Sequence, residues 1–266
     1  MNEYLIATIQ GVVEGLTEFL PVSSTGHLIL SAHLLNFTGE KADTFEVFIQ
    51  LGAILAVAVL YRQRIFDMLR RWRDRPWASD RLTLWHVALA MIPAVIMGLL
   101  LHKKIKLYLF SPKTVLIGLV VGGIYLIVAE RWQPPVRANT VDQMTWRQAL
   151  GVGMFQCLAL WPGFSRSGAT IAGGLLLGIS HEAAAEFSFL LAVPMMCAAT
   201  GKDLWSSREL LSMNDAGVFA VGFVVSFIVA WLAIVGFMRF LNRTKLTPFA
   251  YYRFVAAAAF GLYMMR

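Results

Sequence analysis

Charged residues are scarce in this chain: only 15% of its 266 residues are Asp, Glu, Lys or Arg, whereas 58% are hydrophobic. Soluble domains carry about 45–50% apolar residues, so this composition excludes an ordinary soluble protein and is typical of an integral membrane protein. At about 20 residues for each span, the chain has room for roughly six to eight spans. Cysteine is also rare, and because Cys157 and Cys197 both lie in apolar segments, we expect free thiols and no disulfide.

The N-terminus lacks the features of a cleavable signal peptide. Met1-Asn-Glu-Tyr4 has no basic residue, and no small-residue cleavage site ends the first apolar stretch. The net charge is +7, but the basic residues fall in short segments between apolar runs. Such residues orient spans in a membrane, so we expect no nucleic-acid binding. The segment 62–81 carries seven arginines, which predicts a cytoplasmic location for it.

One polar stretch interrupts the apolar pattern near the N-terminus: Glu14-Gly-Leu-Thr-Glu-Phe-Leu-Pro-Val-Ser-Ser-Thr-Gly-His27. Glu14 and Glu18 lie one helical turn apart on the same face, where like charges repel. Within a membrane, such a pair requires a cation, a shared proton or a basic partner. We expect the helix to stop near Pro21. The Ser-Ser-Thr-Gly turn that follows exposes backbone N–H groups, which can hold an anion.

A second polar stretch repeats the first in the other half of the chain. Gly153 to Pro162 aligns with Gly11 to Pro21, with a one-residue slip before the proline. Ser165-Arg-Ser-Gly168 then aligns with the Ser-Ser-Thr-Gly turn. Each stretch predicts two short helices joined by a polar turn, which lipid permits only where protein buries the turn or a cavity wets it.

We therefore predict an all-α polytopic membrane protein of two repeats, each a re-entrant helix-loop-helix followed by three transmembrane helices. Since three spans are an odd number, the second repeat is expected to have inverted topology, with the two turns entering from opposite faces. The predicted first repeat is 1–130 (re-entrant 4–36; spans 44–61, 82–101 and 114–129), the linker is 131–148, and the second repeat is 149–266 (re-entrant 149–179; spans 183–200, 216–236 and 248–265).

Together the two turns offer the groups that phosphoryl transfer or hydrolysis requires. Arg166 presents a fork of donors suited to phosphate oxygens. Carboxylates do not bind phosphate directly, so Glu14 and Glu18 would hold a divalent cation that bridges to it. His27 follows Ser24 by three residues, close enough to accept its proton and make a nucleophile.

The same residues also have structural interpretations. The serines of both turns would serve equally well as helix caps. Arg166 would be an interfacial anchor, and His27 a packing residue. Glu46 and Glu186 occupy matching positions in the two halves, and either fix the turns by hydrogen bonds or take part in the chemistry.

The two polar stretches closely resemble the signature motifs of the bacterial undecaprenyl-diphosphatase family, also called bacitracin resistance proteins. The second motif is Leu160-Trp-Pro-Gly-Phe-Ser-Arg-Ser-Gly-Ala-Thr170, and the resemblance extends over nearly the whole chain, including Met91-Ile-Pro-Ala-Val. It implies hydrolysis of undecaprenyl diphosphate to undecaprenyl phosphate and inorganic phosphate. This reaction recycles the lipid carrier for peptidoglycan and other envelope polymers and confers bacitracin resistance. The resemblance also implies a requirement for Mg²⁺ or Ca²⁺.

The resemblance further implies roles for individual residues. Glu14 and Glu18 would bind the metal ion, and Arg166 would clamp the phosphate. Ser24 would be the nucleophile with His27 as its base, or His27 would itself attack. The residues that would bind the substrate around them are Ser23, Thr25, Gly26, Ser165, Ser167, Gly168 and Thr170.

With the arginine-rich segment inside, the first turn would face the periplasm from a bacterial cytoplasmic (inner) membrane. The expected partners are the polyprenyl diphosphate and membrane lipids. The sequence does not decide whether the protein forms a homodimer. The rival hypothesis is a polyprenyl-phosphate flippase or secondary transporter, which inverted repeats alone would favour. A carrier needs a continuous polar path through both halves, whereas the enzyme needs the nucleophile and the base. The most useful observation is whether Glu14, Glu18, His27 and Arg166 converge on one cavity.

Overall fold

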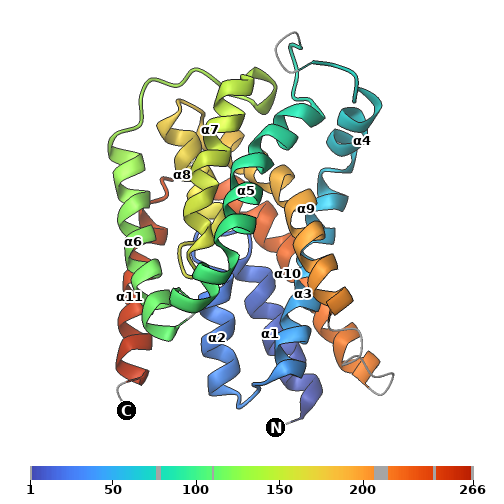
Figure 1. Cartoon of the computed structure of the whole chain (residues 1–266), viewed down its shortest axis with the longest axis vertical. Coiled ribbons are helices and arrows are strands. Elements are labelled where there is room, and N and C mark those ends of the chain that lie inside the picture. Colours follow the sequence, from blue (N-terminus) through green and yellow to red (C-terminus); the bar gives the residue numbers. More distant parts are fainter. Residues whose placement is uncertain (1, 76–78, 110, 207–214, 242–243, 265–266) are drawn as a thin grey trace.

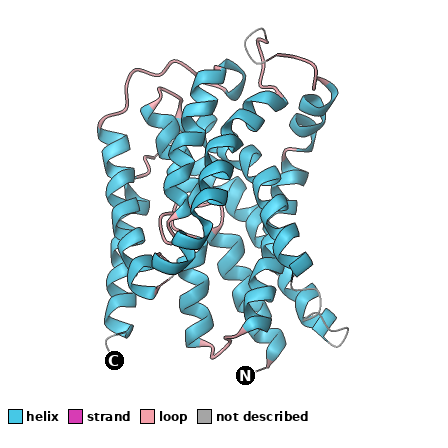
Figure 2. Cartoon of the chain, viewed as in Figure 1, coloured by secondary structure: helices cyan, strands magenta, loops and turns pink. Residues whose placement is uncertain are grey.

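The computed structural model describes residues 2–75, 79–109, 111–206, 215–241 and 244–264, without the side chains of His102 and Lys106. Over these residues the fold is helical, and the sole β pairing there is an isolated bridge between Ala138 and Ile179 (Figure 2). The helices are α1 (Glu3–Thr17), α2 (Ser24–Leu34), α3 (Glu40–Leu60), α4 (Arg62–Arg70), α5 (Leu84–Tyr108), α6 (Pro112–Arg131), η1 (Val141–Gln143), α7 (Trp146–Gln156), η2 (Cys157–Leu160), α8 (Arg166–Leu176), α9 (His181–Ser206), α10 (Ala216–Leu241) and α11 (Thr247–Met264).

Five helices in the described part of the chain are long and apolar enough to cross a membrane: α3, α5 up to Leu101, α6, α9 up to Trp205, and α10. These five correspond to five of the six predicted spans. The sixth prediction, 248–265, forms α11 but is not among the five, because an arginine and three tyrosines lower its hydropathy. Its last residue, 265, lies outside the described residues.

The two polar stretches form the predicted helix pairs, α1 with α2 and α7 with α8. In Figure 1 the first pair lies in the lower half of the molecule and the second in the upper half, and the turns that join them meet inside the helical body. α1 packs against α10, and α7 packs against α5. An added Cβ at Gly11 would lie 2.7 Å from the carbonyl oxygen of Gly222, and one at Gly153 would collide with that of Ala90. These aligned glycines therefore both allow close helix packing.

The segment 131–148, predicted as a linker, docks onto the helical body through several of its residues. Ala138 and Val141 are fully buried, and Asp142 accepts hydrogen bonds from both the Arg64 guanidinium (2.7 and 2.9 Å) and the backbone N–H of Leu82 (2.9 Å). Burial raises the pKa of this carboxyl group, but these hydrogen bonds outweigh burial and lower the pKa of Asp142 below its ordinary value. The segment docks onto the body because its apolar residues are covered and its carboxylate is paired.

The first part of the arginine-rich segment 62–81 forms α4. Arg64 on α4 contacts Glu186 of α9 through its Nε atom, at 3.4 Å from Oε1. Glu186 therefore pairs at the end of the molecule near α4 rather than with the second polar turn. Glu46, its match in the first half, lies on α3 one helical turn before Gln50.

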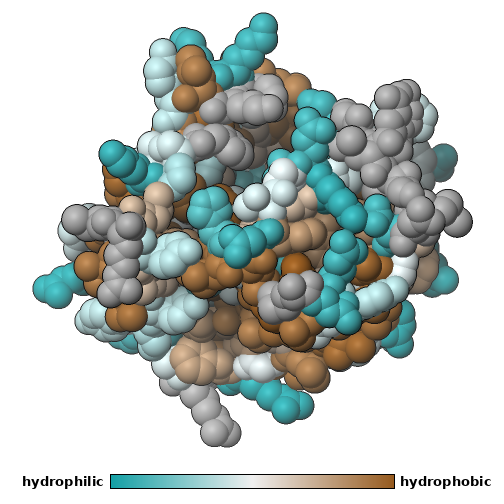
Figure 3. Space-filling model, turned by 90° about the horizontal axis from the view of Figure 1, so that it is seen from below, coloured by the Kyte–Doolittle hydropathy of each residue, from teal (hydrophilic) through white to brown (hydrophobic). Residues whose placement is uncertain are grey.

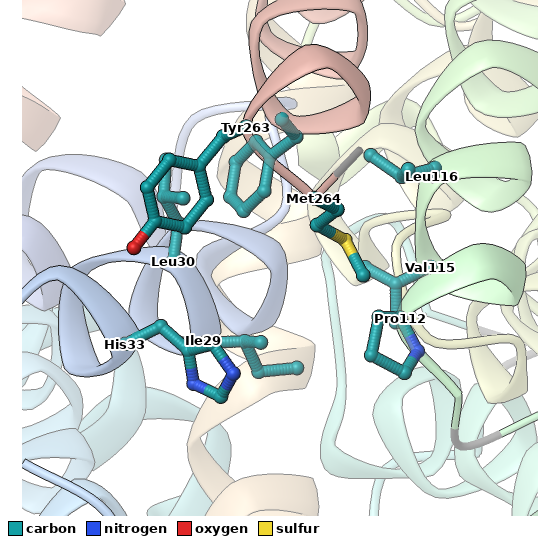
Figure 4. A pocket seen from close by; sticks show the side chains of 9 residues that line it. Ile29, Leu30, His33, Pro112, Val115, Leu116, Tyr263 and Met264 are labelled. Atoms are coloured by element: carbon teal, nitrogen blue, oxygen red, sulfur yellow. The ribbon is translucent and has the colours of Figure 1, made fainter. Parts of the chain in front are cut away.

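The opposite end carries the N-terminus and is seen in Figure 3, where hydrophilic side chains gather among hydrophobic ones. Lys41 binds Asp215 at 2.6 Å and lies 4.0 Å from Glu3, which ties α3, α1 and the start of α10 together there. A small apolar cavity of about 30 Å³ lies between α2, α6 and α11, with His33 and Tyr263 on one side and Leu116 on the other (Figure 4). Cys157 and Cys197 are both free, as predicted.

Candidate active site

Glu18 of the first turn contacts two groups that the sequence places in the same site. Its Oε1 accepts a hydrogen bond from Nη2 of Arg166 at 3.2 Å, and its Oε2 accepts one from the hydroxyl of Ser24 at 2.5 Å. The side chains of Glu18 and Arg166 are only 8% and 16% exposed. A carboxylate, a hydroxyl and a guanidinium from opposite halves of the chain therefore form one largely buried cluster.

The guanidinium of Arg166 is held from behind by α9. Its Nη1 donates to the carbonyl oxygen of Ser188 at 3.0 Å, and the Ser188 hydroxyl lies 2.7 Å from that of Thr170. The guanidinium carbon also lies 5.6 Å from the centre of the Phe19 ring, a cation–π arrangement. These contacts fix the arginine side chain before any ligand arrives, which lowers the entropic cost of binding an anion.

A polar cavity of about 340 Å³ lies where the two turns meet. Its lining residues are Glu18, Ser23, Ser24, Thr25, Gln50, Ala159, Trp161, Pro162, Gly163, Ser165, Arg166, Met196 and Ala199. The first residues of both α2 and α8 are among them, so two helix N-termini border one cavity. The partial positive charge and free N–H groups of a helix N-terminus favour anions. Together with Arg166, they make this cavity suited to phosphate oxygens.

The two helix starts differ in one respect. At α8 the hydroxyl of Ser165 accepts a hydrogen bond from the N–H of Gly168 at 3.1 Å. At α2 the equivalent Ser23 makes no side-chain cap. The first N–H groups of α2 are thus available to a bound anion, whereas α8 is partly capped by its own serine.

Some predicted site residues lie behind the cavity. Ser167 donates to the carbonyl oxygen of Leu20 at 2.8 Å, which joins the second turn to the first, and Thr170 supports Ser188. Gly26, Ser167, Gly168 and Thr170 are buried and do not line the cavity. These residues shape the turns, whereas Ser23, Thr25 and Ser165 reach the cavity surface.

A model of the family described as bacitracin resistance protein BacA matches residues 7–259, which include both turns. The chain belongs to the BacA family. This confirms the resemblance to undecaprenyl-diphosphatases that the two motifs carry, and it identifies the protein as a member of a phosphatase family.

In this BacA-family protein, Glu14 does not reach the cavity surface. It is fully buried on α1, and neither of its side-chain oxygens has a hydrogen-bond partner in the described part of the chain. The backbone N–H of Glu18 donates to the carbonyl oxygen of Glu14 at 3.0 Å, so Glu14 lies in the last turn of α1 and Glu18 caps its end. Glu14 therefore lies one turn from Glu18, beneath the cavity surface rather than on it.

His27 lies on α2 but is engaged away from Ser24. Its Nδ1 lies 2.8 Å from the carbonyl oxygen of Ser23, and its Nε2 lies 2.7 Å from the hydroxyl of Tyr252 on α11. A carbonyl only accepts, so Nδ1 carries a proton and donates to it. The rings of His27 and Tyr252 are nearly parallel, at 7° and 5.5 Å between centres. The hydroxyl of Ser24 is bonded to Glu18 instead.

Arg253 of α11 is a residue that the sequence reasoning missed. It is fully buried and donates to four backbone carbonyls. Those of Pro21 (3.3 Å) and Gly163 (2.7 Å) belong to the two turns, and those of Gly118 (3.1 Å) and Leu119 (3.0 Å) belong to α6. One guanidinium therefore holds both BacA motifs and adds positive charge behind the cavity. The signal in the sequence was an arginine inside a predicted span, which is rare unless it has a function.

Proposed function

We propose that this protein hydrolyses undecaprenyl diphosphate to undecaprenyl phosphate and inorganic phosphate, as a phosphoric anhydride hydrolase. The observation that carries the proposal is the convergence of Ser24, Glu18 and Arg166 on one cavity bordered by two helix N-termini. Membership of the BacA family supports the same reaction. The product is the lipid carrier of peptidoglycan synthesis, so recycling it would also counteract bacitracin.

In the proposed first step, the hydroxyl oxygen of Ser24 attacks the terminal phosphorus, and the bond from this phosphorus to the bridging oxygen breaks. Undecaprenyl phosphate leaves with the bridging oxygen, and the proton of Ser24 passes to Glu18, which already accepts its hydrogen bond at 2.5 Å. Arg166 and the N–H groups at the start of α2 bind the equatorial oxygens. Water then attacks the phosphorus of the phosphoserine, the bond to the Ser24 oxygen breaks, and that oxygen takes the proton held by Glu18. Both protons of the water remain on the phosphate, which is released as H₂PO₄⁻.

We assign the base role to Glu18 rather than to His27. Both ring nitrogens of His27 are occupied by Ser23 and Tyr252 in the structure, and neither contacts Ser24. A base must lie within hydrogen-bond reach of the proton that it takes. In this proposal His27 is a positioning residue that holds the backbone of Ser23. The competing hypothesis, attack by His27 itself, predicts a phosphohistidine intermediate.

We further propose that Glu14 and Glu18 hold a divalent cation, Mg²⁺ or Ca²⁺. The fit is suggested by Glu14, whose two buried oxygens have no hydrogen-bond donor in the described residues. A buried carboxyl group of this kind requires a cation or a proton. No group of three or more His, Cys, Asp or Glu residues that could hold a metal occurs in the described ranges. Mg²⁺ is often bound by one or two carboxylates with substrate phosphates and water, and when bound it would neutralise diphosphate charge.

The proposed setting is the bacterial inner membrane, with two inverted repeats and the site reached from the periplasm. The opposite placement of the α1–α2 and α7–α8 pairs in Figure 1 supports an inverted repeat, as does the paired use of Gly11 and Gly153. The arginines of 62–81 support a cytoplasmic location for the end that carries α4. The first turn then enters from the other side, where the diphosphate head group would be hydrolysed.

The deciding experiment measures phosphate release from undecaprenyl diphosphate by the purified, detergent-solubilised protein with Mg²⁺. We expect release by the wild type, and none by Ser24→Ala, Glu18→Ala or Arg166→Ala variants that elute and melt as folded protein. Arg71→Ala is the matched control, because Arg71 is exposed and outside the cavity. Near-normal turnover by a cavity variant would reject the assignment. If the wild type releases no phosphate but moves the lipid between leaflets, the rival flippase hypothesis is correct.

A further inference from the structure

A second, larger cavity lies on the other side of the first turn. It measures about 580 Å³ and is formed by α1 with the first turn (Leu16, Leu20 and Val22), by α10 (Gly236 and Phe240) and by α11 (Tyr252). We call it the apolar groove. Leu16, Phe240 and Tyr252 are 46%, 37% and 48% exposed, so the groove opens at the side of the bundle. In a membrane protein that side faces lipid.

The first turn is a wall shared by the apolar groove and the polar cavity. Thr17, Leu20 and Val22 line the groove, whereas Glu18 and Ser23 line the polar cavity. Successive residues of one short segment thus face an apolar and a polar space. A ligand that contacts both sides of this turn must be an amphiphile with an anionic head and an apolar tail.

A chain of hydrogen bonds runs from the groove to the residue that precedes the proposed nucleophile. Tyr252 lines the groove, and its hydroxyl lies 2.7 Å from His27, which in turn lies 2.8 Å from the carbonyl oxygen of Ser23. The residue after Ser23 is Ser24. A tail lying against Tyr252 would therefore contact the residue that holds His27, and His27 in turn is bonded to the backbone next to the attacking hydroxyl.

The groove wall is rigid and aromatic. Phe249 packs edge-on against both Phe237 and Phe240, each at 5.4 Å between ring centres. Rings held in this way keep the groove open without a ligand, because each ring is supported by its neighbour. A preformed apolar site binds a hydrocarbon chain without the entropic cost of ordering its own side chains.

We propose that the apolar groove binds the hydrocarbon tail of the lipid diphosphate whose head group is hydrolysed in the polar cavity. The inference rests on the proposed function and adds to it a tail subsite bounded by α1, α10 and α11. The occupant is the substrate's own tail rather than an acyl chain of the bulk bilayer, because only a tail joined to the diphosphate is fixed at the shared turn.

Gly236 offers a clean test. It lines the groove, and a Cβ added there would meet no atom within 4 Å, so a large side chain fills the groove without disturbing the helix. Gly201 on α9 is the matched control, since a Cβ there also meets nothing within 4 Å and the residue lines neither cavity. We expect Gly236→Trp to raise the KM for undecaprenyl diphosphate about tenfold or more, the effect of displacing two or more buried methylene groups.

The same Gly236→Trp variant should change the KM for isopentenyl diphosphate far less, because a five-carbon chain has few methylene groups to lose from the groove. Gly201→Trp should match the wild type with both substrates. An unchanged KM of Gly236→Trp for the long substrate, or an equal loss with both substrates, would overturn the tail subsite. If the wild type releases phosphate from neither substrate, the proposed hydrolase function is wrong. This result differs from those that would overturn the tail subsite alone.

A photoreactive group on the isoprenyl chain of the substrate identifies the occupant directly. We expect it to label α10 or α11 peptides that line the groove, and to label them less in Gly236→Trp. Labelling of these peptides by a photoreactive phosphatidylglycerol chain, with none by the isoprenyl probe, would overturn the proposal in favour of a bulk lipid.

Discussion

Ser23 and Ser165 adopt the same unusual backbone conformation at the two helix starts, with φ of 73° and 79°. Only one other non-glycine residue in the described chain, Asn36, has positive φ. Each serine directly precedes a helix whose first residues line the polar cavity. A side chain in this region of φ costs roughly 1–2 kcal/mol, so the strain is retained at both turns where the backbone must aim N–H groups at a ligand.

Replacing these serines by glycine should separate strain from capping. We expect Ser23→Gly to raise the free energy of unfolding by about 0.5–1 kcal/mol, because glycine removes the strain and no cap is lost. Ser165→Gly should raise the free energy of unfolding by less, since it also removes the hydroxyl that accepts a hydrogen bond from the N–H of Gly168. Thermal unfolding of both variants in one detergent measures the difference. An equal gain at both sites would contradict the capping argument.

The identity of the intermediate distinguishes the two candidate nucleophiles. We expect phosphate transferred from a labelled diphosphate to be found on Ser24 as an acid-stable phosphoserine, because its hydroxyl already contacts Glu18. Glu18→Gln should lower kcat about 10²–10⁴-fold as the loss of a general base. Rapid acid quenching with mass spectrometry of the 14–27 peptide makes the measurement. An acid-labile adduct on His27 would reverse the roles.

Removal of divalent cations should abolish activity reversibly. We expect EDTA to stop phosphate release and added Mg²⁺ to restore it, and Glu14→Gln to need a higher Mg²⁺ concentration for half-maximal rate. The reason is that Glu14 has two buried oxygens without a donor in the described residues. Glu3→Gln, at the exposed start of the same helix, provides a matched change outside the pair. An unchanged Mg²⁺ dependence in Glu14→Gln would exclude this carboxylate as a ligand.

Arg253 should be essential for stability. Arg253→Met leaves four buried carbonyl oxygens without their donor, for which we expect a loss of about 3–5 kcal/mol in the free energy of unfolding. Arg253→Lys should lose only part of this free energy, because the lysine ammonium group still supplies three donors, although they are not arranged in a planar fork. Thermal unfolding measures both, with exposed Arg71→Met as the control. Wild-type stability of Arg253→Met would show that the turns are held by other contacts.

Acid should weaken the docking of the segment 131–148. The pKa of Asp142 is lower in the folded chain than its ordinary value of 3.8, so its stabilising effect is complete above that value and is lost as the pH falls through the folded pKa. We expect the difference in melting temperature between wild type and Asp142→Asn to be constant near neutral pH and to shrink below about pH 4. A difference that stays constant into this acid range would contradict the assignment.

The helical plan could be read from the sequence because membrane spans and polar interruptions have strong local signals. Five of the six spans and both helix pairs follow from runs of apolar residues and from the motifs around Pro21 and Pro162. The docking of 131–148 could not be read in this way. The carboxylate of Asp142 pairs with Arg64, which is 78 positions away, and nothing in the local sequence pattern identifies that partner.

The site was predicted unevenly for the same reason. Glu18, Ser24 and Arg166 were identified by residue type within the motifs, and the structure brings them together. The direction in which His27 points was not predictable, because it is set by Tyr252, 225 positions later. Arg253 was visible as a charge in an apolar helix, but its role depends on the carbonyls of two distant turns.

The sequence by itself determined that the chain is a helical membrane protein with two polar turns and which chemical groups those turns carry, because composition and short-range pattern suffice for this. Only the tertiary structure decided which of these groups share a cavity, which nitrogen of a histidine is engaged and where an apolar groove lies beside the turn. Those properties arise from packing between segments far apart in the chain, where a rotation of one side chain changes its partner without changing any local pattern.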